Sequence, residues 1–170
     1  MTKKAVITLS LIMVVIFSII MIFRCGQYIL VYQANRKINV SGIKLMMTEN
    51  EVKRILGDEE EYIPGSGGYK LEYPSKGIFL TFLNDKDTDF YCKVNQIEVI
   101  DSKYEVFSIR VGDEFDKAVN TIYKQGFIQV KDGFEGYWRT NMYVVLDKNN
   151  NMVQKITVGV RDRVSSSRTY

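Results

Sequence analysis

The stretch IKLMMTENEVKRILG, residues 43–57, has the pattern of an apolar lead-in followed by a short amphipathic helix. Thr48 and Glu51 have the spacing of a capping box, in which each side chain bonds to the backbone N–H of the other residue. Gly57 is the residue type that commonly ends a helix. We therefore predict a helix that begins after Thr48 and buries one apolar face, formed by Val52, Ile55 and Leu56.

The same order of elements occurs again about 60–66 residues further along the chain. Residues 109–126 repeat the apolar lead-in and the helix, with Asp113 as the expected cap and Gly126 as the expected stop. The apolar positions of VNQIEV (94–99) recur one for one in VQKITV (153–158). This repetition predicts two similar halves, although a chance likeness of generic amphipathic segments remains the alternative.

Three strands are expected after each helix. In the first half they are residues 69–73, 77–83 and 94–99, and in the second half residues 134–140, 141–147 and 153–158. Polar turns separate them at 84–89 and 147–151, and residues 127–131 lead into the second set. The predicted fold class is α+β, with an N-terminal transmembrane helix followed by two helix–β–β–β repeats. The repeats are expected to form an antiparallel sheet with the helices on one face.

The transmembrane prediction comes from an unbroken apolar run, AVITLSLIMVVIFSIIMIF, at residues 5–23. At about 1.5 Å per residue, a helix of this length crosses a hydrocarbon core of about 30 Å. A cleaved signal peptide and a lipoprotein acylated at Cys25 are the alternatives. The length of the run disfavours the first, and Arg24 stands where a lipoprotein would have a small residue.

The domain organisation follows from these elements. The basic residues Lys3 and Lys4 favour a cytoplasmic N-terminus, although Arg24, Arg36 and Lys37 lie on the other flank and weaken that bias. We therefore expect a single-pass protein of the cell membrane, with its domain extracytoplasmic. The expected segments are a basic n-region (1–4), a transmembrane helix in contact with membrane lipid (5–23), a juxtamembrane stalk (24–40), a first α+β repeat (41–101), a second α+β repeat (102–162) and a disordered tail (163–170).

The charge of the chain is unevenly distributed. The whole sequence has 23 basic and 20 acidic residues, but five of the basic residues and none of the acidic ones precede Ile38. The remainder therefore carries 18 basic against 20 acidic residues and has no excess positive charge to meet phosphates. Nucleic acid is accordingly not expected as a partner.

Little in the sequence indicates catalysis. The chain contains no histidine, which excludes Ser-His-Asp and Cys-His catalysis and any histidine-ligated zinc site. Cys25 and Cys92 are too few for a disulfide framework or a thiolate metal site. We expect no enzyme and no cofactor; an enzyme would need a pair of carboxylates held in a cleft.

Three polar segments are expected to be loops or turns without a binding role. The acidic run 58–61 is expected to be a solvated loop, and residues 65–68 (GSGG) a flexible connection. Residues 85–89 have alternating aspartates, but Phe90 and Gln96 stand where a calcium-binding loop needs glycine and a bidentate glutamate. We therefore expect a hairpin turn there and no metal site.

The opening of the first repeat resembles the beta-lactamase inhibitory protein-like and SmpA/OmlA (BamE-like) repeats. The glycine usual before Met-Thr in those repeats is Met46 here, and in the second half Asp113 and Glu114 replace Met-Thr. The resemblance covers roughly residues 40–160 and implies tandem repeats whose sheet presents a concave binding surface. It implies an extracytoplasmic binding or scaffold protein, but the intra-repeat disulfides of the inhibitor are absent, so inhibition does not carry over. The matching positions are Met47, Thr48, Val52, Leu56 and Gly57.

Aromatic residues on or beside the predicted strands are the candidate contacts with a protein partner, because aromatics commonly anchor interfaces. Trp138 is expected on the sheet face opposite the helices. The function predicted is a membrane-anchored extracytoplasmic protein-binding or scaffold module that uses its exposed sheet face. The alternative is a structural subunit of a membrane assembly, held through its transmembrane helix, whose domain binds no ligand. The candidate interaction residues are Tyr69, Tyr73, Tyr137, Trp138, Arg139 and Tyr143.

Overall fold

The computed structural model describes residues 12–18, 28–88, 90–130 and 136–161. Its centre is an antiparallel sheet of eight strands in the order β2-β3-β4-β5-β10-β9-β8-β7. The first half of the chain supplies β2 (Glu61–Gly65), β3 (Gly68–Tyr73), β4 (Ile78–Leu83) and β5 (Val94–Val99). The second half supplies β7 (Ile128–Val130), β8 (Gly136–Arg139), β9 (Met142–Asn149) and β10 (Met152–Val160).

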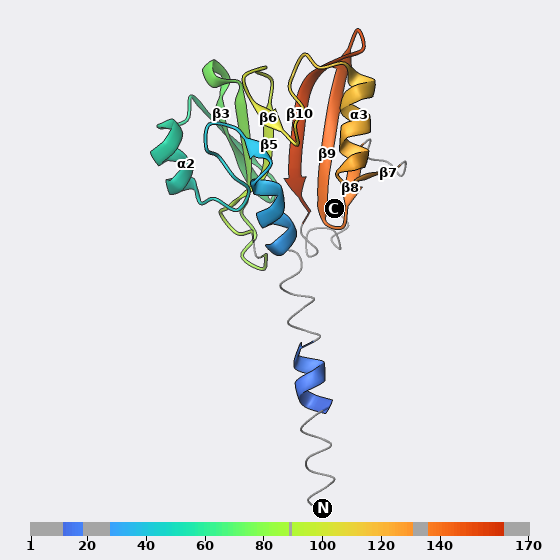
Figure 1. Cartoon of the computed structure of the whole chain (residues 1–170). Coiled ribbons are helices and arrows are strands. Elements are labelled where there is room, and N and C mark those ends of the chain that lie inside the picture. The colour runs from blue at the N-terminus through green and yellow to red at the C-terminus, as the bar shows by residue number, and fades with distance from the viewer. Residues whose placement is uncertain (1–11, 19–27, 89, 131–135, 162–170) are drawn as a thin grey trace, which may run out of the picture.

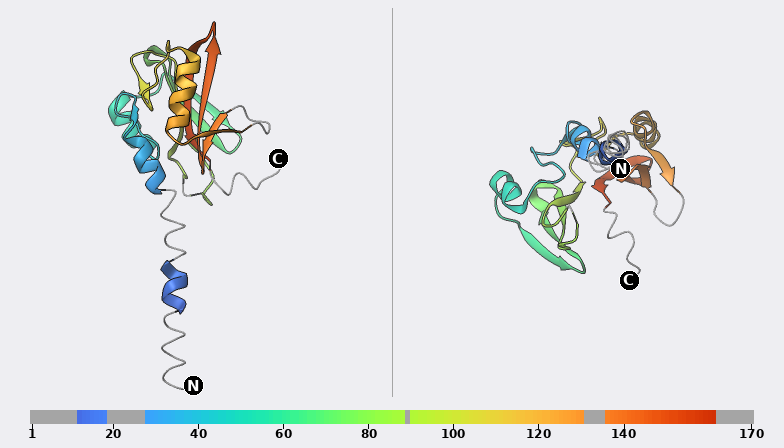
Figure 2. Two further views of the ribbon diagram at one scale, coloured as in Figure 1. Left: turned by 45° about the vertical axis from the view of Figure 1, so that its right-hand side comes forward. Right: turned by 90° about the horizontal axis from the view of Figure 1, so that it is seen from below.

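The helices lie together on one side of this sheet, whereas the β2–β3 hairpin projects toward the other side (Figures 1 and 2). The two helices of the repeats are α2 (Glu49–Leu56) and α3 (Phe115–Lys124). Residues 28–35 form a further helix, which buries Val31 and Ala34 against the domain. Two short strands, β1 (Ile38–Asn39) and β6 (Glu105–Val106), pair with each other, and a single 3-10 turn, η1 (Pro74–Lys76), precedes β4.

The two halves repeat the same backbone hydrogen bonds. In the first half, Met46 N–H donates to the Val94 carbonyl, and Val94 N–H donates to the Met47 carbonyl, both at 2.8 Å. In the second half, Gly112 N–H donates to the Val153 carbonyl at 2.8 Å, and Val153 N–H donates to the Asp113 carbonyl at 2.9 Å. Each helix is therefore attached by its N-terminal approach to the last strand of its own half.

The core lies between the helices and the sheet. Strand residues alternate between the two faces of a sheet, and the apolar members of this alternation point toward the helices. Val52 of α2 and Ile122 of α3 are fully buried on the helix side. Their counterparts on the sheet are also fully buried, and include Leu71, Leu80, Ile97, Val144, Ile156 and Val158.

The capping box predicted for the first helix is confirmed, and Gly57 is its C-cap. The cap predicted for the second helix is wrong, because Glu114 is the N-cap residue and its side chain makes no capping bond. The carboxylate of Asp113 instead accepts a hydrogen bond from the backbone N–H of Arg110, at 2.8 Å. Asp113 therefore closes the turn before the helix.

The predicted helix–β–β–β repeats are wrong, because each half has four strands in the sheet. In the first half the missed strand is β2, all of whose residues are exposed. An edge strand without a buried face lacks the apolar alternation by which strands are recognised, and Pro64 disfavours a strand further. The segment 65–68 forms the turn between β2 and β3, and Glu61 is the first residue of β2.

The predicted N-terminal transmembrane helix is also overturned. In the described residues the apolar run is helical only at 12–18, and none of the described helices is long and apolar enough to cross a membrane. The rest of the 5–23 run, the basic n-region 1–4, Cys25 and the predicted tail at 163–170 lie outside the described residues. The predicted single-pass anchor and the alternative of a membrane-held structural subunit both depended on that helix.

Asn35 ties the helix at 28–35 to the domain. Its side-chain amide donates to the Leu45 carbonyl at 3.0 Å and accepts from the Leu45 N–H at 2.9 Å. We expect Asn35→Ala to lower the free energy of unfolding by about 1–3 kcal/mol, because it leaves two backbone groups of a buried residue without partners. Urea denaturation measures this, with Gln33→Ala, at an exposed site on the same helix, as the control. Equal stability of the two variants would contradict the role of Asn35.

Candidate functional site

The sheet face turned away from the helices is the candidate site, and we call it the distal face. On β8, the ring of Tyr137 packs edge-on against Tyr123 of α3, with ring centroids 5.7 Å apart. The next residue, Trp138, therefore points the other way, and it is paired in register with Tyr143 of β9. The prediction that Trp138 lies opposite the helices is confirmed.

Strand register defines one row of side chains that crosses the whole distal face. Neighbouring residues in this row are directly opposite each other in adjacent strands, so their side chains are in contact range. From β2 to β7 the row is Ile63, Lys70, Thr81, Gln96, Gly159, Tyr143, Trp138 and Ile128.

The six predicted interaction residues are divided between the two faces. Trp138 and Tyr143 lie on the distal face, whereas Tyr69, Tyr73 and Tyr137 are buried on the helix side. Arg139 also lies on the helix side, where its guanidinium donates to the Gln125 carbonyl at 3.0 Å. It thereby satisfies a free carbonyl at the C-terminal end of α3, where a positive charge is favourable. The structure therefore brings together two of the six.

Tyr69 shows why aromatic residues alone were a poor guide. Its ring is stacked between those of Tyr62 and Phe82, with centroid distances of 5.5 and 5.0 Å. Its hydroxyl donates to the carboxylate of Glu49 in the first turn of α2, at 2.7 Å. Tyr69 thus attaches α2 to the sheet and is part of the packing between the two.

Tyr143 is held at the centre of the distal row. Its hydroxyl donates to the Gln96 side-chain carbonyl at 2.6 Å, and its ring centroid lies 5.2 Å from that of Trp138. Gly159 makes room for this ring, since a Cβ at that position would lie 2.3 Å from it. Burial raises the pKa of Tyr143 to about 12. The cluster of Gln96, Gly159, Tyr143 and Trp138 spans β5, β10, β9 and β8.

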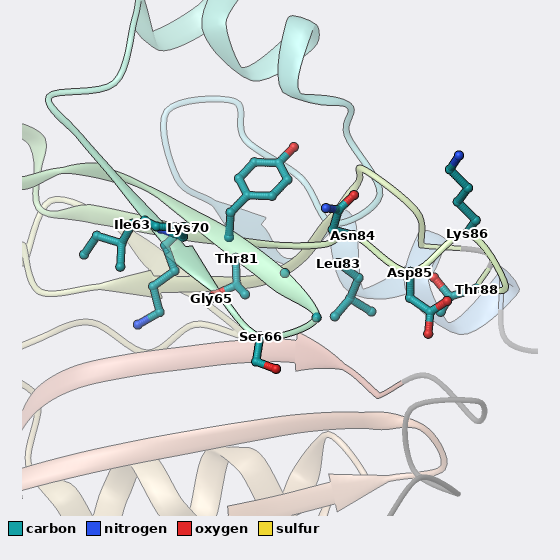
Figure 3. A pocket seen from close by; sticks show the side chains of 14 residues that line it. Ile63, Gly65, Ser66, Lys70, Thr81, Leu83, Asn84, Asp85, Lys86 and Thr88 are labelled. Carbon is teal, nitrogen blue, oxygen red and sulfur yellow. The ribbon is translucent and has the colours of Figure 1, made fainter. Parts of the chain in front are cut away.

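The distal face is hollowed beside the β2–β3 hairpin (Figure 3). The hollow has a volume of about 440 Å³, within the range of small-molecule sites. Ile63, Lys70 and Thr81 belong both to this hollow and to the distal row. Further lining residues are Pro64, Ser66, Leu83, Asn84 and Asp85.

An asymmetry between the halves builds this hollow. In the second half, β9 and β10 are joined by the two residues Asn150 and Asn151, both with positive φ. In the first half, the corresponding connection between β4 and β5 runs from residue 84 to 93 and lines the hollow. This loop is anchored by Phe90, which is buried, and by Asn84, whose N–H donates to the Gly67 carbonyl of the hairpin turn at 3.0 Å.

The hollow contains polar groups without partners in the protein. In the described part of the chain, the ammonium of Lys70 makes no hydrogen bond and no ion pair within 4.0 Å. The side chains of Ser66, Thr81 and Asn84 are likewise without hydrogen bonds to described residues. Sequence analysis missed this site, but the longer polar loop in the first repeat was a signal for it.

The acidic segments have structural contacts. Glu59 pairs with Lys53 at 2.8 Å, and the hydrogen bond from that ammonium lowers the pKa of Glu59. Glu60 accepts from the Ser75 N–H at 3.0 Å. Asp85 accepts from the Asp87 N–H at 3.1 Å, whereas Asp89 lies outside the described residues. Within the described ranges, no three Cys, Asp or Glu side chains are grouped so as to hold a metal ion.

Comparisons with known proteins identify a similar fold. No family model and no curated protein matches this sequence. A solved structure similar to this chain is that of an extracellular protein containing a SCP domain from Bacillus anthracis str. Ames, with a TM-score of 0.51 and 11% identity. The match covers 68% of this chain and 44% of that protein, so this chain spans less than half of its length. The resemblance to the inhibitory protein-like and BamE-like repeats stays a prediction.

The buried phenol of Tyr143 predicts a loss of stability at alkaline pH. Because the folded-state pKa is raised above the ordinary value of about 10, the contribution is full below pH 10 and is lost as pH rises through 12. Tyr143→Phe should therefore reduce the loss of unfolding free energy above pH 10 by about 3 kcal/mol. Urea unfolding between pH 9 and 12 measures it, with Tyr32→Phe at an exposed site as the control. An identical pH dependence in both variants would contradict the assignment.

Proposed function

We propose that this chain is an extracytoplasmic protein-binding module that contacts its partner through the distal face. The observation that carries the proposal is the hollow of about 440 Å³ on the sheet face away from the helices. A surface hollow lined by apolar side chains and a few polar groups is the usual form of a binding site.

The remainder of the distal row supports a partner larger than a small molecule. The row extends from Ile63, at the hollow, to Ile128 on the opposite edge strand, and these side chains are 37% and 65% exposed. Between them lie Tyr143 and Trp138, and Arg161 places its guanidinium 5.8 Å from the Trp138 ring. Aromatic and arginine side chains among smaller residues are typical of the anchors of protein interfaces.

The extracytoplasmic location is supported by the similarity of fold to a protein described as extracellular. A binding role is favoured over catalysis because the chain has no histidine to serve as a base at neutral pH. The lysines and carboxylates that do lie close together, such as Lys155 with Glu98 and Asp147, form ion pairs on a strand surface outside the hollow.

Site-specific photo-crosslinking tests which side of the sheet contacts the partner. A benzoylphenylalanine at Ile63 or Ile128 should crosslink a partner in the native host, because both positions are exposed on the distal face. The matched positions Asn50 and Asn120, exposed on α2 and α3, should give no crosslink. Crosslinks from the two helices alone would place the interface on the wrong side of the sheet and overturn the proposal.

Protease treatment of intact cells should digest the domain without lysis, and protection until lysis would overturn the proposed extracytoplasmic location.

A further inference from the structure

Two lysines line the hollow, Lys70 and Lys86, and neither forms an ion pair with a described residue. Lys70 projects from the middle of β3, with Ile63 and Thr81 directly opposite it in the neighbouring strands. Another lysine of this face, Lys155, pairs with Glu98 at 3.6 Å and with Asp147 at 2.8 Å. Lys70 has no such partner among the described residues, although Glu72 lies two residues along the same strand. An anionic group of a ligand can therefore bind Lys70 without breaking an existing ion pair.

The rest of the hollow surrounds this charge with apolar surface and neutral donors. Ile63, Pro64 and Leu83 supply the apolar lining, and the hydroxyls of Ser66 and Thr81 can donate hydrogen bonds. A carboxylate that receives an ammonium and neutral donors forms the stronger, charge-assisted class of hydrogen bond. A phosphate is less favoured, because it carries more negative charge than a carboxylate while the lining includes the acidic Asp85 and contains no arginine.

The hairpin turn keeps the hollow open. A Cβ on Gly68 would lie 2.4 Å from the Phe82 carbonyl oxygen, so this position accepts no larger residue without moving β4. The bond between Asn84 N–H and the Gly67 carbonyl holds the loop against the turn. The walls are therefore formed before a ligand arrives, which lowers the entropy cost of binding.

The neighbouring strand edge limits how a peptide can bind. β2 is an edge strand, but Pro64 has no backbone N–H and so interrupts the donors that an added strand would need. Continuous addition of a peptide strand to β2 is therefore disfavoured.

From these observations we propose that the hollow binds the C-terminal carboxylate of an extended peptide whose last residue is apolar, with Lys70 as the carboxylate receptor. The inference rests on the proposed protein-binding function and specifies which part of the partner this end of the distal face recognises. The same carboxylate chemistry could come from an acidic side chain within a peptide, and the experiment separates the two sources.

The test uses N-acetyl-Ala-Ala-Leu, either as the free acid or as the C-terminal carboxamide, titrated into the ¹⁵N-labelled full chain. We expect the free acid to shift the amide resonances of Ser66, Gly67, Lys70 and Asn84 in a saturable way. The carboxamide should bind about 10- to 100-fold more weakly, the range for losing hydrogen bonds to a charged group. N-acetyl-Ala-Glu-Ala carboxamide carries an internal carboxylate and should bind as weakly as the leucine carboxamide.

Two variants assign the effect to Lys70. Lys70→Gln removes the charge from an exposed side chain and should make the free acid bind as weakly as the carboxamide. Lys86→Gln is the matched control, because Lys86 also borders the hollow but its side chain points away from it (Figure 3). It should leave the preference for the free acid unchanged. An unchanged spectrum away from the hollow verifies that each variant is folded.

Three results would overturn the inference. Equal binding of free acid and carboxamide would show that the terminal carboxylate is not recognised. Tighter binding of the glutamate peptide would show that the hollow binds acidic side chains within a peptide instead. The absence of shifts at millimolar peptide would show that the hollow does not accept a peptide terminus. None of these results changes the crosslinking from Ile63 and Ile128, so failure here is distinguishable from failure of the proposed function.

Discussion

The antiparallel pairing of β5 with β10 is the constraint on which the rest of the molecule depends. Each half contributes four strands, and only this pairing makes them one sheet. Its register places Ile97 opposite Val158 and Val99 opposite Ile156, all fully buried. A shift of β10 by one residue would turn Ile156 and Val158 to the distal face and expose them. Burial of apolar area at about 25 cal/mol per Å² thus selects a single register, and the same register places Gln96 beside Gly159 and under Tyr143.

A second, smaller seam closes the other side of the core. β1 pairs with β6, and each is followed by a tight turn that returns to an isolated bridge, Val40 with Ile43 and Val106 with Ile109. Both seams are antiparallel pairings between the two halves. The helices cover one face, and the other face remains available for a partner.

The site arises where the two halves differ. A two-residue connection between β9 and β10 leaves the sheet surface smooth, whereas the ten-residue connection between β4 and β5 rises beside the β2–β3 hairpin. Phe90 and Thr88 of this loop are buried, so its position is determined by packing as well as by the bond from Asn84. A duplicated scaffold supplies the rigid sheet, and one longer loop on it supplies the hollow.

Several elements could be predicted from local sequence because their causes are local. The capping box of Thr48 and Glu51 involves residues three apart, and the apolar alternation of 94–99 needs no distant partner to be recognised. β2 could not be recognised in this way, since an exposed edge strand is stabilised by pairing with β3 and carries no buried pattern. For the N-terminal segment the local pattern led to the wrong prediction. The apolar run at 5–23 predicts a helix that crosses a membrane, whereas the described helix at 12–18 is too short to do so.

The sequence by itself determined the two helices, the repeated strand pattern and the absence of histidine chemistry, because these depend on residue type and on spacing within a few turns or strands. Only the tertiary structure decided which aromatic residues face the helices and which face away. Tyr69 and Trp138 are both aromatic strand residues, yet one attaches α2 and the other lies on the distal face. The tertiary structure also determines where the hollow forms. Its lining residues Lys70, Thr81 and Asn84 come from neighbouring strands and from a loop whose course depends on packing. Contacts between residues distant in sequence carry that information, and no local pattern reports it.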